Sequence, residues 1–180
     1  MNESSQPWPA FDDEVIRAMA KWPDVPQCFG WLSLDVRGRW RIQGELIAHI
    51  RAQAFLSRHY RADEQGRWYV QNGPQQVFVA LDYTPWIYRW QPHQSFTTHT
   101  GLETQHLRAV YLDDDGNLLV LTALGIGMLD DRDLAACEAL IEWHELGMAR
   151  TFQWQQIRLP LTTLCRAQVA ERFGFVPQPQ

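Results

Sequence analysis

The sequence predicts an α+β fold with mostly antiparallel sheets, built from two hairpin–helix–strand units and completed by additional N- and C-terminal helices. Hydrophobic residues repeat at helical spacing in some segments and at every second position in others. Glycine-containing tight turns separate the alternating segments, and the order hairpin, helix, strand occurs twice, at about 31–82 and again at about 107–157. These observations predict a structural repeat in the order of elements.

The spacing of apolar residues predicts the secondary-structure elements of the first 59 residues. Phe11, Val15, Met19 and Trp22 predict an N-terminal helix that Pro23 stops. The alternating segments 32–36 and 39–43 predict a hairpin with one wet face, and the broad apolar stripe of 45–59 predicts a helix.

The next segments predict strands. Residues 67–71 and 76–82 are joined by a turn at 72–74, and 77–81 is apolar on both faces, which is typical of a central strand. Trp86, Tyr88 and Trp90 share one face of a further strand. The polar segment 92–105 is expected to be a long loop.

The second unit begins with a hairpin at 107–112 and 118–124, around the acidic run 113–115. A helix capped at Asp130 or Asp131 is expected to run through Met148, followed by a strand at 151–157. Pro160 and Gly174 frame a last helix. The expected organisation is a tail and helix at 1–30, a first unit at 31–92 and a second unit at 93–180, forming one compact domain or two small subdomains.

Composition excludes several classes of protein. The 180 residues carry a formal net charge of −5, which argues against a nonspecific nucleic-acid binder. No apolar run approaches the ~18 residues of a membrane helix, and the first residues show no secretion signal. The three cysteines form no CxxC pair. We therefore expect a cytoplasmic protein with reduced thiols that binds neither nucleic acid nor membranes.

No catalytic constellation is evident. The chain has no Gly-x-Ser-x-Gly elbow, and Cys137 and Cys165 fall on expected apolar helix stripes. His93, His99 and His106 lie six and seven residues apart in the polar segment, a spacing that indicates solvated histidines rather than metal ligands. We assign no catalytic residue, no metal and no cofactor.

Other motifs have structural explanations. The 113–117 run lacks the glycine and glutamate positions of a calcium loop, so a hairpin turn explains it better. The 125–127 segment lacks the third glycine of a dinucleotide loop, and aspartates follow it. Among the remaining histidines, His144 is expected to be a core or interface residue, whereas His49 and His59 should be exposed.

A polar and aromatic surface is the remaining candidate site. Amides gather at and beside a turn whose flanking strands are aromatic, and Arg89 is the only formal positive charge between Arg67 and Arg108. Such a surface suits a small polar or anionic ligand. The proposed ligand-binding residues are Trp68, Gln71, Asn72, Gln75, Trp86 and Arg89. In the competing interpretation, Arg89 pairs with Asp82 or with a helix glutamate and is structural.

The segment 31–90 resembles uncharacterised proteobacterial families of unknown function. The resemblance rests on Gly38-Arg39-Trp40, on 63–69 and especially on the run 68–77, Trp-Tyr-Val-Gln-Asn-Gly-Pro-Gln-Gln-Val. It implies an α+β fold with repeated hairpin–helix–strand units and a suggested role in signal transduction, but no established catalytic residues.

The sequence therefore leaves three functions open. The first is a cytosolic, non-catalytic module that binds a small ligand or regulates a partner. The second is a hydrolase that uses a loop histidine. The third is a homodimer that buries exposed tryptophans.

Overall fold

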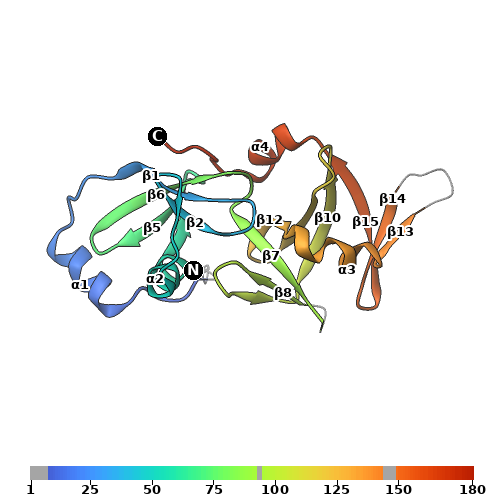
Figure 1. Cartoon of the computed structure of the whole chain (residues 1–180), viewed down its shortest axis with the longest axis horizontal. Coiled ribbons are helices and arrows are strands. Elements are labelled where there is room, and N and C mark those ends of the chain that lie inside the picture. Colours follow the sequence, from blue (N-terminus) through green and yellow to red (C-terminus); the bar gives the residue numbers. More distant parts are fainter. Residues whose placement is uncertain (1–7, 93–94, 144–148) are drawn as a thin grey trace, which may run out of the picture.

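A computed structural model describes residues 8–92, 95–143 and 149–180, and strands dominate it (Figure 1). The strands of the first sheet are β1 (Cys28–Leu34), β2 (Trp40–Ile42), β3 (Glu45–Leu46), β4 (Tyr60–Ala62), β5 (Trp68–Asn72) and β6 (Gln75–Leu81). Those of the second are β7 (Trp86–Gln91), β8 (Ser95–Thr98), β9 (Glu103–Thr104), β10 (Leu107–Asp113), β11 (Leu118–Thr122), β12 (Gly125–Leu129), β13 (Ile141–Trp143), β14 (Ala149–Trp154) and β15 (Ile157–Leu164).

The helices are few and short. They are α1 (Asp13–Lys21), α2 (Ile50–Arg58), α3 (Leu134–Glu138) and α4 (Val169–Phe173), with 3-10 turns at Asp131–Asp133 and Arg166–Gln168. In Figure 1 the first sheet, α1 and α2 form one half of the molecule, and the second sheet, α3 and α4 form the other. Among the described residues, no helix has the length and apolar content needed to cross a membrane.

Both sheets are mixed, because they contain parallel as well as antiparallel strand pairs. Most neighbouring strands are antiparallel, but β1 pairs with β6, β10 with β15 and β12 with β7 in parallel. The parallel pairs β1–β6 and β10–β15 have the same origin. In each run of six consecutive strands, the last strand returns beside the first. β6, which is apolar on both faces, lies centrally between β1 and β5, as its sequence predicts.

The same strand order occurs twice. The first sheet runs β3-β2-β1-β6-β5-β4, and the second contains β12-β11-β10-β15-β14-β13, with a helix between the third and fourth strands of each series along the chain. The strand β7 was placed in the first unit by its sequence, but it pairs with β12 and extends the second sheet together with β8 and β9. The expected long loop at 92–105 therefore contains two strands.

Three turns with the pattern Asp-x-x-Gly connect strands at 35–39, 63–67 and 113–117. In each turn, Oδ1 of the aspartate accepts the backbone N–H groups two and four residues later, at 2.7–3.0 Å. The glycines at the fourth position have φ between +72° and +83°, a region that favours glycine. This local chemistry explains why turns were predictable there.

Three expected helices differ from the observed ones. The 45–59 helix starts only at Ile50, since Glu45 and Leu46 pair with β2. The helix expected from Asp130 to Met148 ends at Glu138, because 141–143 pair with β14; His144 and Met148 lie outside the described residues. The helix expected from Pro160 begins at Val169, because β15 pairs with β10 and buries Leu161 and Leu164.

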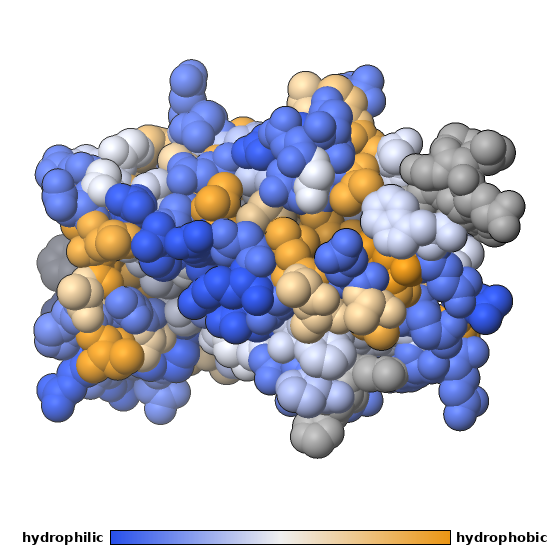
Figure 2. All heavy atoms as spheres, turned by 45° about the vertical axis from the view of Figure 1, so that its right-hand side comes forward, coloured by the Kyte–Doolittle hydropathy of each residue, from blue (hydrophilic) through white to orange (hydrophobic). Residues whose placement is uncertain are grey.

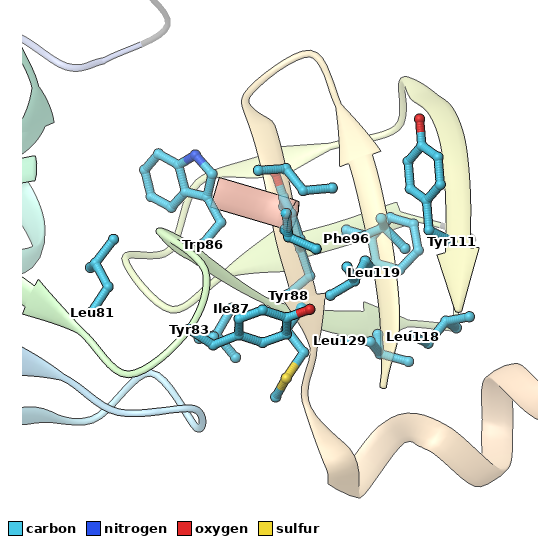
Figure 3. Packing of buried hydrophobic residues seen from close by; sticks show 14 of the residues in the cluster. Leu81, Tyr83, Trp86, Ile87, Tyr88, Phe96, Tyr111, Leu118, Leu119 and Leu129 are labelled. Atoms are coloured by element: carbon cyan, nitrogen blue, oxygen red, sulfur yellow. The ribbon is translucent and has the colours of Figure 1, made fainter. Parts of the chain in front are cut away.

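The core continues from one sheet to the other. Figure 3 shows Phe96, Leu119 and Leu129 packed in the second half, with Trp86 at the side that faces the first sheet. An aromatic cluster joins the halves, in which Trp86 lies 5.0 Å from Trp68 and 5.5 Å from Tyr60 between ring centroids. Large apolar residues also reach the surface, and Figure 2 shows them as separate patches among hydrophilic side chains.

Candidate functional site

A pocket of about 400 Å³ lies between the β5–β6 hairpin and the end of α1 with the segment that follows it. Pockets that bind small molecules span roughly 300–1,000 Å³, so its size suits such a ligand. We call it the glutamine pocket; it is lined by Met19, Trp22, Pro23, Val25, Gln27, Gln71, Pro74 and Gln76. The lining contains three amide side chains and no charged one.

Local sequence chemistry assembles this pocket. Pro23 ends α1, and the turn glycine Gly73 has φ +57° and lies close to the helix, since a Cβ added there would be 3.8 Å from Ala18 Cβ. Two amides tie the segment before β1 to the hairpin. Gln27 Nε2 donates to Gln76 Oε1 at 3.1 Å, and Gln75 Nε2 donates to the Pro26 carbonyl at 3.1 Å.

Gln71 is the buried member of the pocket, with only 1% of its surface exposed. Its Nε2 donates to the Gly73 carbonyl at 2.9 Å, which fixes the orientation of the amide because a carbonyl cannot donate. Its Oε1 is buried and accepts no hydrogen bond from any described residue. An unsatisfied buried acceptor costs on the order of 1–3 kcal/mol, so this atom lacks the partner that buried acceptors normally have.

A second buried polar residue, Arg61, lies on the same face of the first sheet. It pairs across the strands with Tyr69, two residues before Gln71. Its guanidinium packs 3.9 Å from the Phe11 ring centroid and donates to the Pro9 carbonyl, and its Nε has no acceptor among the described residues. Burial lowers the pKa of Arg61 and raises that of Tyr69.

Arg61 is not among the ligand-binding residues proposed from the sequence, whereas Arg89 is. The available signal was the position of Arg61 opposite Tyr69 in a hairpin around the Asp63 turn. In the structure, Arg89 Nε and Nη2 donate to both carboxylate oxygens of Asp133 at 2.6 and 3.1 Å. This contact with Asp133, rather than with Asp82 or a helix glutamate, raises the pKa of Arg89. The structural interpretation of Arg89 thus has a specific partner.

The six proposed residues lie in four different places. Trp68 and Trp86 are 6% and 1% exposed in the aromatic cluster between the sheets. Asn72 lines an apolar groove between β5 and α2, whereas Gln71 and Gln75 are at the glutamine pocket and on its rim. Alternation along β5 causes this split, because Trp68 and Asn72 project from the face opposite to Gln71. The tryptophan in the pocket is Trp22.

A larger cavity, of about 500 Å³, opens beside the link from β6 to β7. Tyr83 donates to Asp113 Oδ2 at 2.7 Å, and the Arg166 guanidinium lies 4.0 Å from the Tyr83 ring centroid. Arg166 also pairs with Asp115 at 3.0 Å. Because these polar groups are paired with one another, this cavity offers a ligand less than the glutamine pocket does.

The histidines do not form a catalytic set within the described residues. His99 belongs to the aromatic cluster, where its Nδ1 accepts the Ile87 N–H at 3.4 Å and burial lowers its pKa to about 3, which leaves a poor general base. His93 lies outside the described residues, and His106 is exposed. In this part of the chain, no three His, Cys, Asp or Glu side chains gather as metal ligands do.

One histidine prediction was wrong. His59 was expected to be exposed, but its side chain is fully buried. The reason is that α2 ends at Arg58, so His59 leaves the helical surface. Its ring stacks on Phe11 and its Nε2 accepts the Asp12 N–H at 3.3 Å. Cys137 is buried as expected, and Cys165 is exposed because it follows a strand instead of lying on a helix.

The fold and the pocket define a two-sheet α+β protein with a polar, uncharged cavity. A family model described as a protein of unknown function (DUF2944/DUF2946) matches residues 11–180, so the chain belongs to this uncharacterised family. Its function is not established by that membership. No curated protein matches the chain.

Two solved structures are similar to the chain. A DUF1285 family protein from Silicibacter pomeroyi DSS-3 is 18% identical with a TM-score of 0.56, over 90% of this chain and 91% of that one. A DUF1285 family protein from Shewanella baltica OS155 is 15% identical with a TM-score of 0.45, over 58% of this chain and 87% of that one. The first similarity shows a shared fold.

Proposed function

We propose that this protein is a non-catalytic, cytoplasmic module that binds a small polar ligand in the glutamine pocket and acts in regulation. The observation that carries the proposal is the buried, unpaired Oε1 of Gln71, a residue that lines a cavity of suitable size. The pocket has no charged lining residue, so it favours an uncharged polar ligand. The anionic ligand expected from Arg89 would find no charged partner there.

We also propose that the two halves are a structural repeat, and this proposal provides a matched control. In the strand correspondence, the β14–β15 hairpin is equivalent to β5–β6, and Gln153 is equivalent to Gln71. Gln153 Nε2 donates to the carbonyl two residues later at 2.9 Å, as Gln71 does. Its Oε1, however, lies 3.4 Å from the Arg158 Nε donor.

The test is a thermal-shift screen of uncharged metabolites on three proteins: the wild type, Gln71→Met and Gln153→Met. Methionine retains length while removing the amide. A ligand of the pocket should stabilise the wild type and Gln153→Met but not Gln71→Met. Stabilisation by RT ln(1 + [L]/Kd) reaches about 2.7 kcal/mol at one hundred times Kd. Hits that stabilise all three proteins equally, or an absence of hits, would contradict the proposal.

A further inference from the structure

The segment 9–27, which includes α1, covers one face of the first sheet, and we call it the strap. We propose that the strap is a conformational device that opens and closes over this face while the two sheets remain folded. The link between this motion and a ligand rests on the proposed function, because the closed strap completes the glutamine pocket.

The strap is anchored at its ends and is thinly attached between them. Trp8 packs in the aromatic cluster before the strap begins, and Cys28 starts β1 after it ends. Between these anchors Val15 is the only buried residue, while Ile16 and Trp22 are 48% and 56% exposed. Segments that bury few apolar side chains open at a lower free-energy cost than the core does.

The hydrogen bonds of the strap add little to this attachment. Within the described chain, its backbone hydrogen bonds stay inside the strap, so no backbone ladder joins it to the sheet. Asp12 pairs with Arg58 at 3.0 Å, but these side chains are 43% and 51% exposed, and exposed ion pairs contribute little to stability. The bonds that Gln27 and Gln75 make between the strap and the hairpin are also exposed.

The face beneath the strap is polar and incompletely satisfied. Arg61 Nε and Gln71 Oε1 are buried there without a hydrogen-bond partner among the described residues. The guanidinium of Arg61 packs on Phe11 of the strap and donates to the Pro9 carbonyl. Water would hydrogen-bond to both unpaired atoms once the strap opened, so burial of these atoms favours the open state.

The corresponding face of the second unit is polar and exposed to solvent. In the proposed strand correspondence, Glu142 takes the place of Arg61, since it pairs with Thr151 as Arg61 pairs with Tyr69. Thr151 donates to Glu142 at 3.0 Å, and Arg158 forms an ion pair with Glu142 at 3.2 Å. The side chains of Glu142 and Arg158 are 50% and 67% exposed. This sheet face is therefore compatible with water, as the open strap requires of the first unit.

The strap and the β5–β6 hairpin each supply part of the glutamine pocket. Five of its lining residues belong to the strap and three to the hairpin, so opening of the strap removes the pocket. A compound that binds only the closed state lowers the open fraction by a factor of 1 + [L]/Kd, about a hundred-fold at one hundred times Kd. Without such a compound, the strap opens more often and exposes His59, Arg61 and Gln71.

Opening is measured by thiol labelling of the variant Val15→Cys. Because Val15 is 4% exposed, a thiol at this position reacts only when the strap opens. The labelling rate, followed by mass spectrometry and divided by that of a free peptide thiol, gives the open fraction, and urea denaturation of the same variant gives the unfolded fraction. We expect the open fraction to exceed the unfolded fraction at least a hundred-fold. Equal fractions would overturn the proposal, because the strap would then open only with the whole protein.

Further variants in the Val15→Cys background test the cause of opening. Gln71→Met removes the unpaired acceptor and should lower the open fraction at least five-fold, whereas Gln153→Met should leave it unchanged. An equal open fraction in these two variants would show that the buried acceptor does not favour opening, which also contradicts the proposal.

These measurements need no ligand, so they separate the strap from the proposed function. A compound that stabilises the wild type through Gln71 in the thermal-shift screen should lower the open fraction, and one that does not would overturn the coupling. If the strap opens but no compound depends on Gln71, the proposed function fails and the opening stands. If compounds depend on Gln71 but the strap does not open, only the conformational device fails.

Discussion

The turn glycines Gly38 and Gly116 provide a quantitative test of how the two halves pack. They occupy the same position of the Asp-x-x-Gly turn, with φ of +72° and +83°. A Cβ at Gly116 would meet nothing within 4 Å, whereas a Cβ at Gly38 would lie 2.4 Å from His99 Cβ. The two positions therefore share backbone strain and differ only in the space around them.

We expect Gly116→Ala to lower the free energy of unfolding by about 1–2 kcal/mol, the cost of a left-handed backbone for alanine. Gly38→Ala should add the cost of overpacking, about 1–3 kcal/mol. His99 cannot easily move away, because its backbone N–H donates to the Ile87 carbonyl at 2.8 Å. Urea denaturation of both variants measures the difference. Equal costs, within about 0.5 kcal/mol, would refute the close contact between the first-sheet turn and His99.

Three further predictions concern single polar groups. Arg89→Ala should cost only about 0.5–1 kcal/mol in urea denaturation, since its ion pair with Asp133 is 40% exposed on the arginine side; a loss above about 2 kcal/mol would contradict this. Tyr83→Phe should cost about 1.5–3 kcal/mol because it removes a buried hydrogen bond to the Asp113 carboxylate, and an unchanged melting temperature would contradict it. Since burial lowers the pKa of His99 to about 3, from an ordinary value of 6.5, the fold favours the neutral ring. The associated stability is fully present above about pH 6.5 and is lost at up to about 1.4 kcal/mol per unit as pH falls toward about 3; an identical pH dependence in His99→Gln would count against this assignment.

The predictable parts of the fold are those encoded by local chemistry. The Asp-x-x-Gly turns, the hairpins around 35–39 and 113–117 and α1 follow from turn residues, alternation and a helix-stopping proline. The errors occur where pairing overrides local spacing. Residues 160–164 have helix-like spacing, but β10 offers a parallel partner. The strands β8 and β9 pair with β7 and with each other in the segment expected to be a loop.

The candidate site divides in the same way. Gln71 and Gln75 were proposed from the sequence because amides beside a tight turn are a local signal, and the structure places them at the glutamine pocket and on its rim. Trp22 and Arg61 could not be identified, because their positions depend on α1 and the preceding segment packing against the first sheet. The ion-pair partner of Arg89 was unpredictable for a related reason, since Asp133 is 44 residues away in the sequence.

A comparison of the β5–β6 and β14–β15 hairpins distinguishes a structural role of Gln71 from the proposed binding role. Gln71 and Gln153 make the same Nε2 contact with the hairpin turn, so support of the turn explains that half of the amide in both units. Turn support does not explain why α1 and the segment after it cover Gln71 and leave its Oε1 without a donor, whereas the Gln153 Oε1 lies near Arg158. A polar group that serves only the fold is normally satisfied when it is buried. Under the proposed function, this unpaired oxygen marks a ligand that the β5–β6 hairpin binds and the β14–β15 hairpin does not.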